Sequence, residues 1–406
     1  MKIITGGVTA AKGFKASGVH AGVKAGSSPD KNDLAMILCD TEAAAAGVYT
    51  MNRVKAAPIY VTMEHLENGV ARGIIANSGN ANACAPMGHE NAVKMCEAAA
   101  SATGLRPEDF IVASTGVIGV PLNVAAIEAA CPTLSSLLSR DGSMEAARAI
   151  MTTDTVPKEI AVSFEIGGKE VRLGGIAKGS GMIHPNMGTM LCFLTTDCAI
   201  TPDVLQGALY DITKITFNRV SVDGDTSTND SCVILASAQA GNPVIDWKSE
   251  DYEVFLEALR YVCTELAKKI AGDGEGATKL VTCTVSGSRS DEAAEKLAME
   301  VIKSSLVKAA MFGADANWGR VLCAMGYSKA PFRPEYVDVS FASAAGEIQV
   351  CRAGEGLAFD EELAKKILTQ SEVEIRVNVN EGEHSVTAWG CDLTYDYVKI
   401  NGDYRT

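Results

Sequence analysis

The spacing of apolar residues changes its period along the chain. From residue 160 to residue 166, apolar side chains alternate with polar or small ones, which predicts a β-strand. Gly167-Gly168 then forms a two-residue turn, and apolar positions follow at Val171 and Leu173. This stretch is therefore predicted to be a β-hairpin.

Elsewhere the spacing is helical, with apolar residues three or four positions apart. The longest predicted helix, 252–271, is ended by Gly272, and its buried stripe consists of Phe255, Leu259, Val262, Leu266 and Ile270. Shorter helices are predicted at 90–103, at 123–130, from Thr201-Pro202 onward, and at 291–311. Gly104 ends the first of these and Pro132 interrupts the second.

Short apolar runs predict further strands between these helices, at 110–113, 190–194, 279–285 and 373–379. Because strands and helices interleave, the predicted fold class is α/β, in the form of an α+β layered sandwich.

Composition narrows the classes of function. The 36 Lys and Arg against 50 Asp and Glu give a net charge of −14, and so acidic a protein repels phosphate backbones. No nucleic-acid partner is expected. Twelve cysteines without a Cys-x-x-Cys pair indicate buried, reduced thiols, and the five histidines lack the spacing of metal ligands. No stretch approaches the ~20 apolar residues of a membrane span, so no membrane partner is expected and the expected location is cytoplasmic.

The first candidate for chemistry is Thr189. Pro185, Gly188 and other glycines interrupt regular structure, and Thr189 then begins an apolar run. In amino-terminal-nucleophile enzymes such a hydroxyl attacks the preceding carbonyl, the chain breaks, and the freed α-amine becomes the base for its own side chain. The unperturbed pKa of that amine, about 7.7–8.0, suits a general base. Taken alone, a Gly-Thr pair at the start of a strand is more typical of ordinary structure.

The second candidate is Ser114-Thr115-Gly116. A small turn that contains a hydroxyl and a glycine can aim a side-chain O–H and a backbone N–H at one point, as an oxyanion hole requires. The same residues are also typical of an ordinary turn after a strand.

Two loops look like ligand-binding loops but break the rules for them. The loop 272–279 is not a phosphate loop, because a Walker sequence needs Gly directly before its Lys. Its Glu275 suits binding of a substrate amine, although a solvated loop carboxylate is the commoner interpretation. The loop from Asp223 is not a calcium loop, since Thr228 and Ile234 stand where Gly and Glu are needed. A network of Asx, Ser and Thr turns is expected there.

Taken together and in order, these segments closely resemble the ornithine acetyltransferase family of arginine biosynthesis, also called the bifunctional glutamate N-acetyltransferase and amino-acid acetyltransferase. The matching strings span nearly the whole chain and are Asn77-Ser-Gly-Asn-Ala-Asn-Ala83, Ser114-Thr-Gly-Val-Ile-Gly119, Met151-Thr-Thr-Asp-Thr155, Lys178-Gly-Ser-Gly-Met182, Pro185-Asn-Met-Gly-Thr-Met-Leu191, Ser221-Val-Asp-Gly-Asp-Thr-Ser-Thr-Asn-Asp230, Gly272-Asp-Gly-Glu-Gly-Ala-Thr278 and Phe312-Gly-Ala-Asp-Ala-Asn-Trp-Gly-Arg320.

The resemblance implies a role for individual residues. Thr189 would be the nucleophile, released by self-cleavage after Gly188, and Thr115 with Gly116 would form the oxyanion hole. The implied substrate-binding residues are Thr152, Lys178, Thr189, Glu275, Asn401 and Thr406. The chemistry agrees, because Lys178 can pair with the carboxylate of N-acetylornithine and Glu275 with its side-chain ammonium.

Two of these assignments depend on neighbouring sequence. Thr153 and Thr155 are alternatives to Thr152, since they lie within a few residues of it. Contacts from Asn401 and Thr406 require a docked carboxy terminus, and the strand-like run 389–400 before it supports docking.

The implied reaction is a ping-pong transfer in a self-processing threonine-nucleophile fold. Thr189 takes the acetyl group of N2-acetylornithine, ornithine leaves, glutamate enters, and N-acetylglutamate departs. The cut would give an α chain, 1–188, and a β chain, 189–406, as one catalytic unit of two intertwined domains that assembles as α2β2 or larger. No metal or organic cofactor is implied, and acetyl-CoA is a second donor in bifunctional members.

One position departs from the family: Gly188 stands where Ala usually precedes the nucleophile. Glycine leaves the scissile carbonyl less crowded but its backbone less constrained, so the direction of the effect on cutting is open. Two alternatives remain at this point. One is a related aminopeptidase-type hydrolase, whose members generally use Ser where this chain has Thr189. The other is a non-catalytic, ligand-binding relative, which only Gly188 favours.

Overall fold

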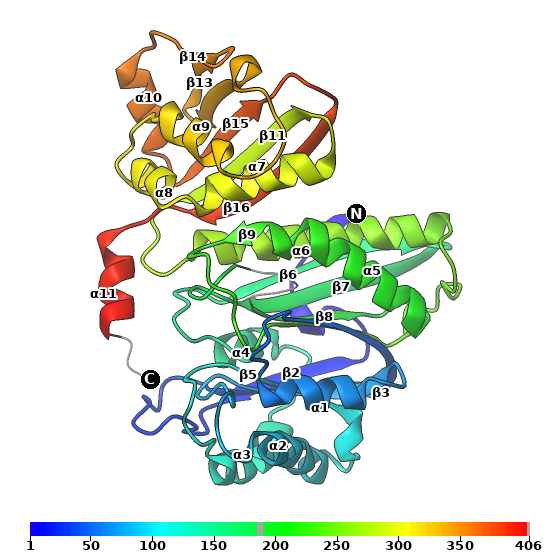
Figure 1. Ribbon diagram of the computed structural model, residues 1–406. Coiled ribbons are helices and arrows are strands. Elements are labelled where there is room, and N and C mark those ends of the chain that lie inside the picture. Colours follow the sequence, from blue (N-terminus) through cyan, green and yellow to red (C-terminus); the bar gives the residue numbers. More distant parts are fainter. Residues whose placement is uncertain (185–189, 404–406) are drawn as a thin grey trace.

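The computed structural model describes residues 1–184 and 190–403. Within these ranges the strands form two sheets, one of nine strands and one of seven, and helices alternate with them along the chain. Figure 1 shows the two sheets in separate lobes, with the nine-stranded sheet in the first domain and the seven-stranded sheet in the second. The predicted layered α/β fold is confirmed.

The nine-stranded sheet folds over on itself. Its order is β1-β6-β7-β8-β10-β3-β4-β5, with β2 paired to β3. The long β3 belongs to two layers, because its first half pairs with β2 and β4 and its second half pairs with β10. The strands are β1 (Lys2–Ile4), β2 (Phe14–Val19), β3 (Leu34–Tyr49), β4 (Val70–Asn77), β5 (Phe110–Ser114), β6 (Lys158–Ile166), β7 (Lys169–Lys178), β8 (Leu191–Thr196) and β10 (Ser231–Ala236).

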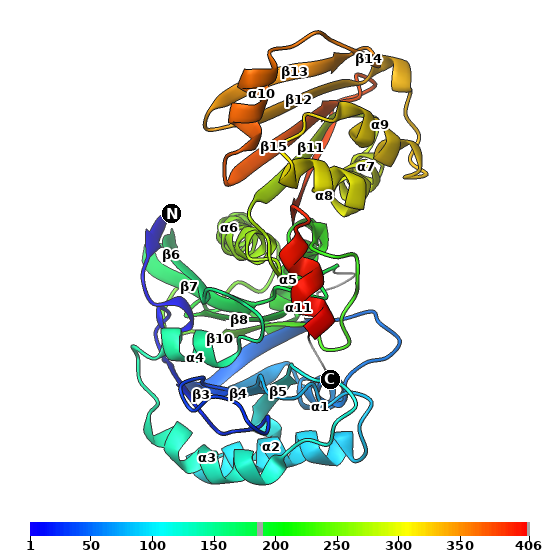
Figure 2. The same cartoon turned by 90° about the vertical axis from the view of Figure 1, so that its left-hand side faces the viewer.

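Helices cover both outer faces of this folded sheet, so that the first domain is an α-β-β-α sandwich (Figure 2). On one face lie α5 (Pro202–Ile215) and α6 (Glu250–Gly272), and on the other α1 (Ala57–His65), α2 (Gly88–Thr103) and α3 (Val124–Ser136). The short α4 (Ser143–Ala149) packs into the core between the two β layers.

Strand β8 shows why the central strands read as unbroken apolar runs. Leu191 and Phe193 point into the core between the β layers, whereas Cys192 and Leu194 point into the core beneath α6. All six residues of the strand are buried, because both of its faces are covered.

The second domain has one covered face and one open face. The order of its sheet is β14-β13-β12-β15-β11-β16-β9, and one face is covered by α7 (Asp291–Lys303), α8 (Ser305–Phe312), α9 (Trp318–Gly326) and α10 (Glu361–Leu368). The strands are β9 (Val220–Ser221), β11 (Leu280–Ser288), β12 (Asp338–Ser343), β13 (Gly346–Arg352), β14 (Glu355–Gly356), β15 (Glu372–Asn378) and β16 (His384–Cys391). Helix α6 of the first domain lies between this sheet and the nine-stranded sheet (Figure 1).

Several local predictions are confirmed. Strands β6 and β7 form the predicted hairpin, and Gly167 and Gly168 occupy its turn with φ of 55° and 72°. Helix α2 ends at Gly104, whose φ is 73°. The predicted stripe of the longest helix is buried along α6. Thr201 stands at the N-cap of α5, but its side chain donates or accepts no capping hydrogen bond there.

Two helix boundaries were predicted wrongly. Helix α3 continues through Pro132 to Ser136, and the residues on either side of the proline, Cys131 and Leu134, are buried against α2. Burial of this face offsets the loss of one backbone hydrogen bond. The single helix expected at 291–311 is two helices, because Ser304 ends α7 and its side chain accepts the Val307 N–H to begin α8.

The strand expected at 389–400 was also predicted wrongly beyond its first residues. Strand β16 ends at Cys391, and α11 (Tyr395–Asp403) follows. The carboxylate of Asp392 accepts the backbone N–H groups of Thr278 (2.8 Å) and Lys279 (3.1 Å), which fixes the chain as it leaves the sheet. Figures 1 and 2 show α11 leaving the second domain and running along the first.

Candidate active site

One pocket in the first domain collects the predicted site residues. Its volume is about 130 Å3, and its lining consists of Thr115, Gly116, Ile118, Thr152, Thr153, Lys178, Gly181, Met182, Ser227, Thr228, Asn229, Glu275 and Asn401. Every predicted oxyanion or substrate residue that the structure describes is in this set. Gly188, Thr189 and Thr406 lie outside the described residues.

The turn after β5 is held in a conformation that only glycine suits at one position. Gly116 has a φ of 127°, and a Cβ there would lie 2.8 Å from the backbone nitrogen of Asn80. The Asn77 side chain accepts the N–H groups of Gly79 (3.2 Å) and Asn80 (3.0 Å), and its backbone carbonyl accepts that of Thr115 (2.9 Å). The asparagine-rich string at 77–83 therefore shapes the turn that carries Thr115 and Gly116.

Lys178, the last residue of β7, is a buried cation at the edge of the pocket. Lys178 is 7% exposed, and its Nζ lies 3.5 Å from the hydroxyl oxygen of Thr115. Burial lowers the pKa of Lys178, and the nearby Asp154 carboxylate opposes that change. An anion that enters the pocket therefore meets a cation that has little competing solvent.

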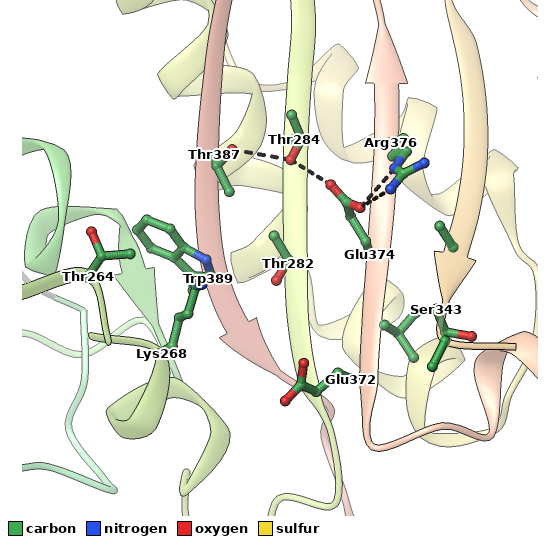
Figure 3. Close-up of a pocket in the computed structure, with 13 residues that line it drawn as sticks. Thr264, Lys268, Thr282, Thr284, Ser343, Glu372, Glu374, Arg376, Thr387 and Trp389 are labelled. Atoms are coloured by element: carbon green, nitrogen blue, oxygen red, sulfur yellow. Dashed lines mark hydrogen bonds and ion pairs between the residues drawn. The ribbon is translucent and has the colours of Figure 1, made fainter. Parts of the chain in front are cut away.

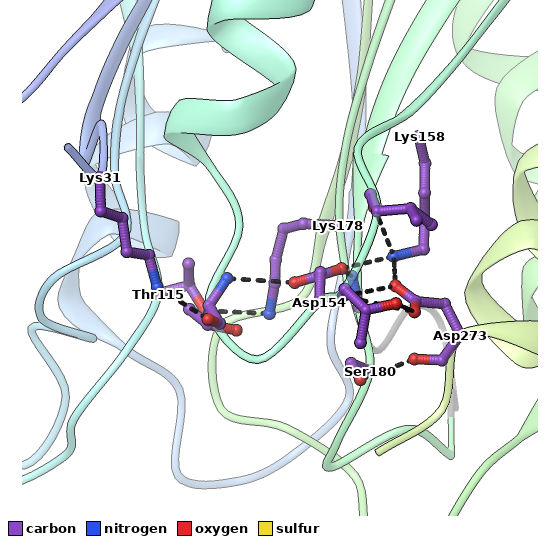
Figure 4. A network of polar contacts seen from close by, with 11 residues as sticks. Lys31, Thr115, Asp154, Lys158, Lys178, Ser180 and Asp273 are labelled. Atoms are coloured by element: carbon purple, nitrogen blue, oxygen red, sulfur yellow. Dashed lines mark hydrogen bonds and ion pairs between the residues drawn. The ribbon is translucent and has the colours of Figure 1, made fainter. Parts of the chain in front are cut away.

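A buried ion network lies behind Lys178 (Figure 4). The Lys158 Nζ lies 2.7 Å from Asp154 Oδ1 and 2.5 Å from Asp273 Oδ2. Asp154 also accepts the backbone N–H groups of Thr152 (3.1 Å) and Gly179 (2.7 Å). Burial disfavours the Asp154 carboxylate, but Lys178 and Lys158 outweigh it and lower its pKa to about 2.

This network joins three separate segments of the pocket wall. The Ser180 hydroxyl donates to the Asp273 carbonyl (2.7 Å), and the Glu275 N–H donates to the Ser180 carbonyl (3.0 Å). Together with the contacts of Asp154, these bonds tie the segments of Thr152, Lys178 and Glu275 to each other. A change at the network should therefore move all three of these predicted binding residues.

Helix α11 completes the pocket from the carboxy-terminal side. Asn401 Nδ2 donates to Glu275 Oε2 at 2.6 Å, and the Thr394 hydroxyl, just before the helix, donates to the Gly276 carbonyl at 2.7 Å. The described part of the tail is thus docked through Thr394 and Asn401, by a helix instead of the expected strand.

The structure distinguishes Thr155 from Thr152 and Thr153, the three threonines among which the sequence did not decide. Thr152 and Thr153 line the pocket. Thr155 instead hydrogen-bonds the Asp273 carboxylate through its backbone and its hydroxyl, and it lines a different cavity. Thr152 and Thr153 therefore both remain candidates for the predicted substrate contact, whereas Thr155 lies outside the pocket lining.

Sequence reasoning missed several residues that shape the site. Asn229 lines the pocket, and its side-chain amide donates to the carbonyls of Ala81 (2.6 Å) and Ser114 (2.8 Å). Asp154 and Lys158 form part of the ion network behind Lys178. Asn229 and Asp154 lie within the matching strings, which was the available signal. The expected turn network is present, since Asn229 N–H donates to Ser227 Oγ at 3.1 Å.

Larger openings lie away from these residues. Three neighbouring cavities of about 530, 470 and 700 Å3 form a groove between α6 and the open face of the second sheet, and Lys268 lines all three. Figure 3 shows the part beside β11 and β15, where Glu374 contacts Arg376 and Thr284. This interdomain groove contains none of the six predicted residues that line the smaller pocket.

Within residues 1–184 and 190–403, no group of three or more His, Cys, Asp or Glu side chains is placed to hold a metal ion. None of the helices formed by those residues combines the length and the apolar character that a bilayer crossing demands. All twelve cysteines are free, and ten of them are buried.

The layered fold and a pocket of buried, opposite charges behind an oxyanion-type turn indicate an enzyme that acts on a small charged substrate. A family model described as the ArgJ family matches residues 15–406. The arginine biosynthesis bifunctional protein ArgJ of Symbiobacterium thermophilum is 52% identical over 407 residues, which cover 100% of both chains. ArgJ 1 of Clostridium acetobutylicum is 50% identical, over 97% of this chain and 96% of its own.

A solved structure agrees with these relatives. The crystal structure of the arginine biosynthesis bifunctional protein ArgJ from Bacillus halodurans is 46% identical and has a TM-score of 0.50, over 52% of this chain and 98% of that one. The chain belongs to the ArgJ family, and the resemblance found in the sequence is confirmed.

Proposed function

We propose that this chain transfers the acetyl group of N2-acetylornithine to glutamate and so produces ornithine and N-acetylglutamate for arginine biosynthesis. The observation that carries the proposal is the single pocket that gathers Thr115, Gly116, Thr152, Lys178, Glu275 and Asn401. The relatives named as arginine biosynthesis bifunctional proteins support it.

The charges of the pocket match those of the donor substrate. Acetylornithine carries one carboxylate and one side-chain ammonium. In the proposed arrangement Lys178 pairs with the carboxylate and Glu275 with the ammonium, and Thr152 and Asn401 add hydrogen bonds. Glutamate shares the carboxylate but lacks the ammonium, so the two substrates use overlapping but different contacts.

The proposed mechanism has two matched halves. The Thr189 hydroxyl attacks the acetamide carbonyl while its proton moves to the α-amine of the same residue, and the oxyanion is held by the Thr115 hydroxyl and the Gly116 N–H. The proton then passes to the ornithine nitrogen as the C–N bond breaks. Glutamate reverses these steps: its amine attacks the acetyl ester, its proton passes through the α-amine to the Thr189 oxygen, and N-acetylglutamate leaves.

A free α-amine on Thr189 requires a cut after Gly188. The crystallised ArgJ chain from Bacillus halodurans supports such a cut, because 98% of it corresponds to only 52% of this chain. Chains of about half length are what cleavage between 188 and 189 would produce. Assembly of the two chains as α2β2 or larger stays a prediction of the family resemblance, as does a cytoplasmic location.

The mechanism as proposed has no step that needs a metal or an organic cofactor. Acetyl-CoA as a second acetyl donor is part of the proposal, and the word bifunctional in the names of the relatives supports it.

One assay tests the proposed function against its alternatives. Purified protein is mixed with N-acetylornithine and glutamate, and the products are separated. N-acetylglutamate together with ornithine is the expected outcome. Free acetate without N-acetylglutamate would identify a hydrolase, and no product would identify a ligand-binding relative.

A further inference from the structure

The two substrates of the proposed reaction differ in charge at the end of their side chains. N-acetylornithine and glutamate share an α-carboxylate and have side chains of similar length, but ornithine ends in an ammonium and glutamate in a carboxylate. Of the described residues that line the pocket, Lys178 is the single cation and Glu275 the single carboxylate. Because Lys178 pairs with the carboxylate that both substrates share, this lining provides no partner for the second carboxylate of glutamate.

The Glu275 side of the pocket repels that second carboxylate. Glu275 is 8% exposed, and its Oε2 accepts the side-chain N–H of Asn401 at 2.6 Å. Two carboxylates in a place with so little solvent repel each other strongly. The side chain of glutamate therefore needs a cation elsewhere at the edge of the pocket.

Lys31, in the loop between β2 and β3, brings a second cation to the pocket wall. Its Nζ donates to the backbone carbonyl of Thr152 at 2.8 Å, and Thr152 lines the pocket. The Asp154 carboxylate accepts the N–H of the same threonine at 3.1 Å. Figure 4 shows the Lys31 side chain extending toward Thr115 from the side away from Lys158. Lys31 and the ion network thus hold the two backbone polar groups of one lining residue.

The loop fixes the backbone of Lys31. The Lys31 N–H donates to the Ser28 carbonyl at 3.1 Å, and the Lys31 carbonyl lies 2.8 Å from Nδ1 of His20. The Asp33 carboxylate accepts two backbone N–H groups from the start of the loop, at 2.6 and 2.8 Å. The side chain therefore begins at a held position, while its flexible four-carbon stem lets the ammonium turn.

The ammonium of Lys31 can accept a better partner than its present one. An ammonium has three N–H donors, and in the described ranges its bond to the Thr152 carbonyl is the one hydrogen bond that this group makes. A carboxylate is a stronger acceptor for an ammonium than a neutral carbonyl. Burial lowers the pKa of Lys31, and the Asp154 carboxylate opposes this change, as it does for Lys178. Both cations therefore lie in the field of Asp154.

We propose that Lys31 binds the side-chain carboxylate of glutamate in the second half of the reaction and so selects glutamate as the acetyl acceptor. The inference rests on the proposed function, because it adds a contact to the same acceptor. Lys178 holds the α-carboxylate, and the Lys31 ammonium turns from the Thr152 carbonyl to the side-chain carboxylate. Two substrates of similar length are thus sorted by opposite charges, the donor by Glu275 and the acceptor by Lys31.

The test compares two acceptors of nearly the same shape, glutamate and glutamine, of which only glutamate has a charged side chain. The wild-type enzyme, supplied with N-acetylornithine, should use glutamate with the higher kcat/KM. In Lys31→Gln we expect the KM for glutamate to rise roughly 5- to 30-fold, and the preference for glutamate over glutamine to fall by a similar factor. The KM for N-acetylornithine should keep its wild-type value, because that substrate has no second carboxylate.

The matched control is Lys269→Gln. Lys269 is also exposed, and its Nζ also donates to a backbone carbonyl, that of Glu159, at 2.6 Å. It lines the interdomain groove instead of the pocket, so this variant should keep the wild-type KM for both substrates. Lys31→Arg retains a cation on the same loop and should retain part of the preference for glutamate.

The outcomes separate the inference from the proposed function. If Lys31 only supported Thr152, its loss would weaken N-acetylornithine, glutamate and glutamine alike. Equal losses of this kind, an unchanged preference in Lys31→Gln, or a wild-type enzyme that uses glutamine as well as glutamate would each overturn the role given to Lys31. A wild-type protein that never transfers an acetyl group from N-acetylornithine to glutamate would instead overturn the proposed function itself.

Discussion

The two sheets of this molecule place their charged side chains in opposite environments. Beside the folded first sheet, Lys158 and Asp154 are 1% and 0% exposed at their side chains and bind each other and neighbouring backbone. On the open face of the second sheet, Arg376 and Glu374 are 48% and 29% exposed and pair in contact with solvent. Burying the first pair costs desolvation free energy and holds the surrounding segments in one geometry. The exposed pair costs little free energy and constrains its surroundings little.

The difference shows why the larger opening is not the stronger candidate for catalysis. The interdomain groove has several times the volume of the small pocket, yet the charges of Glu374 and Arg376 on its sheet side are screened by water. In the small pocket, Lys178, Glu275 and the oxyanion turn surround a space of about 130 Å3. Electrostatic stabilisation of a transition state is strongest in such a water-poor space.

The largest expected effect comes from the residue that would start the chemistry. Thr189→Ala should leave a single uncut chain without acetyl transfer, because both the cut and acetyl capture need its hydroxyl. Thr189→Ser should keep part of each activity, since it keeps a hydroxyl. Denaturing gels measure the cut and the transfer assay measures acetyl transfer. Full turnover by the alanine variant would refute the assignment of Thr189 as the nucleophile.

The contrast between buried and exposed ion pairs can be measured as stability. Lys158→Met should lower the free energy of unfolding by about 3–5 kcal/mol, because it removes the ammonium that pairs directly with the buried Asp154 and Asp273 carboxylates. Arg376→Met on the open sheet should cost at most ~1 kcal/mol. Chemical denaturation of both variants measures these losses of stability. Similar losses in the two variants would contradict the contrast between buried and exposed ion pairs.

The oxyanion turn should act on the rate and not on binding. Thr115→Ala should lower kcat by ~10²–10³ with little change in KM, as expected for a donor used mainly in the transition state. Steady-state kinetics with acetylornithine measure this. A normal kcat with a raised KM would place Thr115 in ground-state binding.

A matched pair of glutamates tests which region binds the donor. Glu275→Gln should raise the KM for acetylornithine by roughly tenfold to a hundredfold, because a charged hydrogen bond contributes about 1.5–3 kcal/mol. The KM for the substrate glutamate should rise less. Glu374→Gln in the interdomain groove should change neither value. Equal losses for both substrates in Glu275→Gln would mean that Glu275 only orders its loop.

The sequence predicted best where a pattern is local. The β6–β7 hairpin follows from alternation and two glycines, and the stripe of α6 follows from its helical spacing. Predictions from the sequence failed where packing decides the structure. Helix α3 continues through Pro132 because Leu134 beyond it is buried, and α11 replaces a strand because Asp392 fixes the chain as it leaves β16.

For the site, the family resemblance supplied the residues and the structure supplied their relation. Thr115, Thr152, Lys178, Glu275 and Asn401 come from distant segments, and no spacing rule could predict that they share a pocket. The ion pairs of Lys158 with Asp154 and Asp273 depend on three-dimensional proximity, so the sequence alone could not predict them although Asp154 and Asp273 lie within the matching strings.

The most direct test of the account is the mass of the protein before and after a short exposure to N-acetylornithine alone. The account predicts two fragments, residues 1–188 and 189–406, and the gain of one acetyl group on the second fragment only, which glutamate then removes. Gly188→Ala provides a comparison for the rate of cutting. A wild-type chain that stays whole while it transfers acetyl groups at full rate would contradict the central claim, because a free α-amine on Thr189 would not be the base.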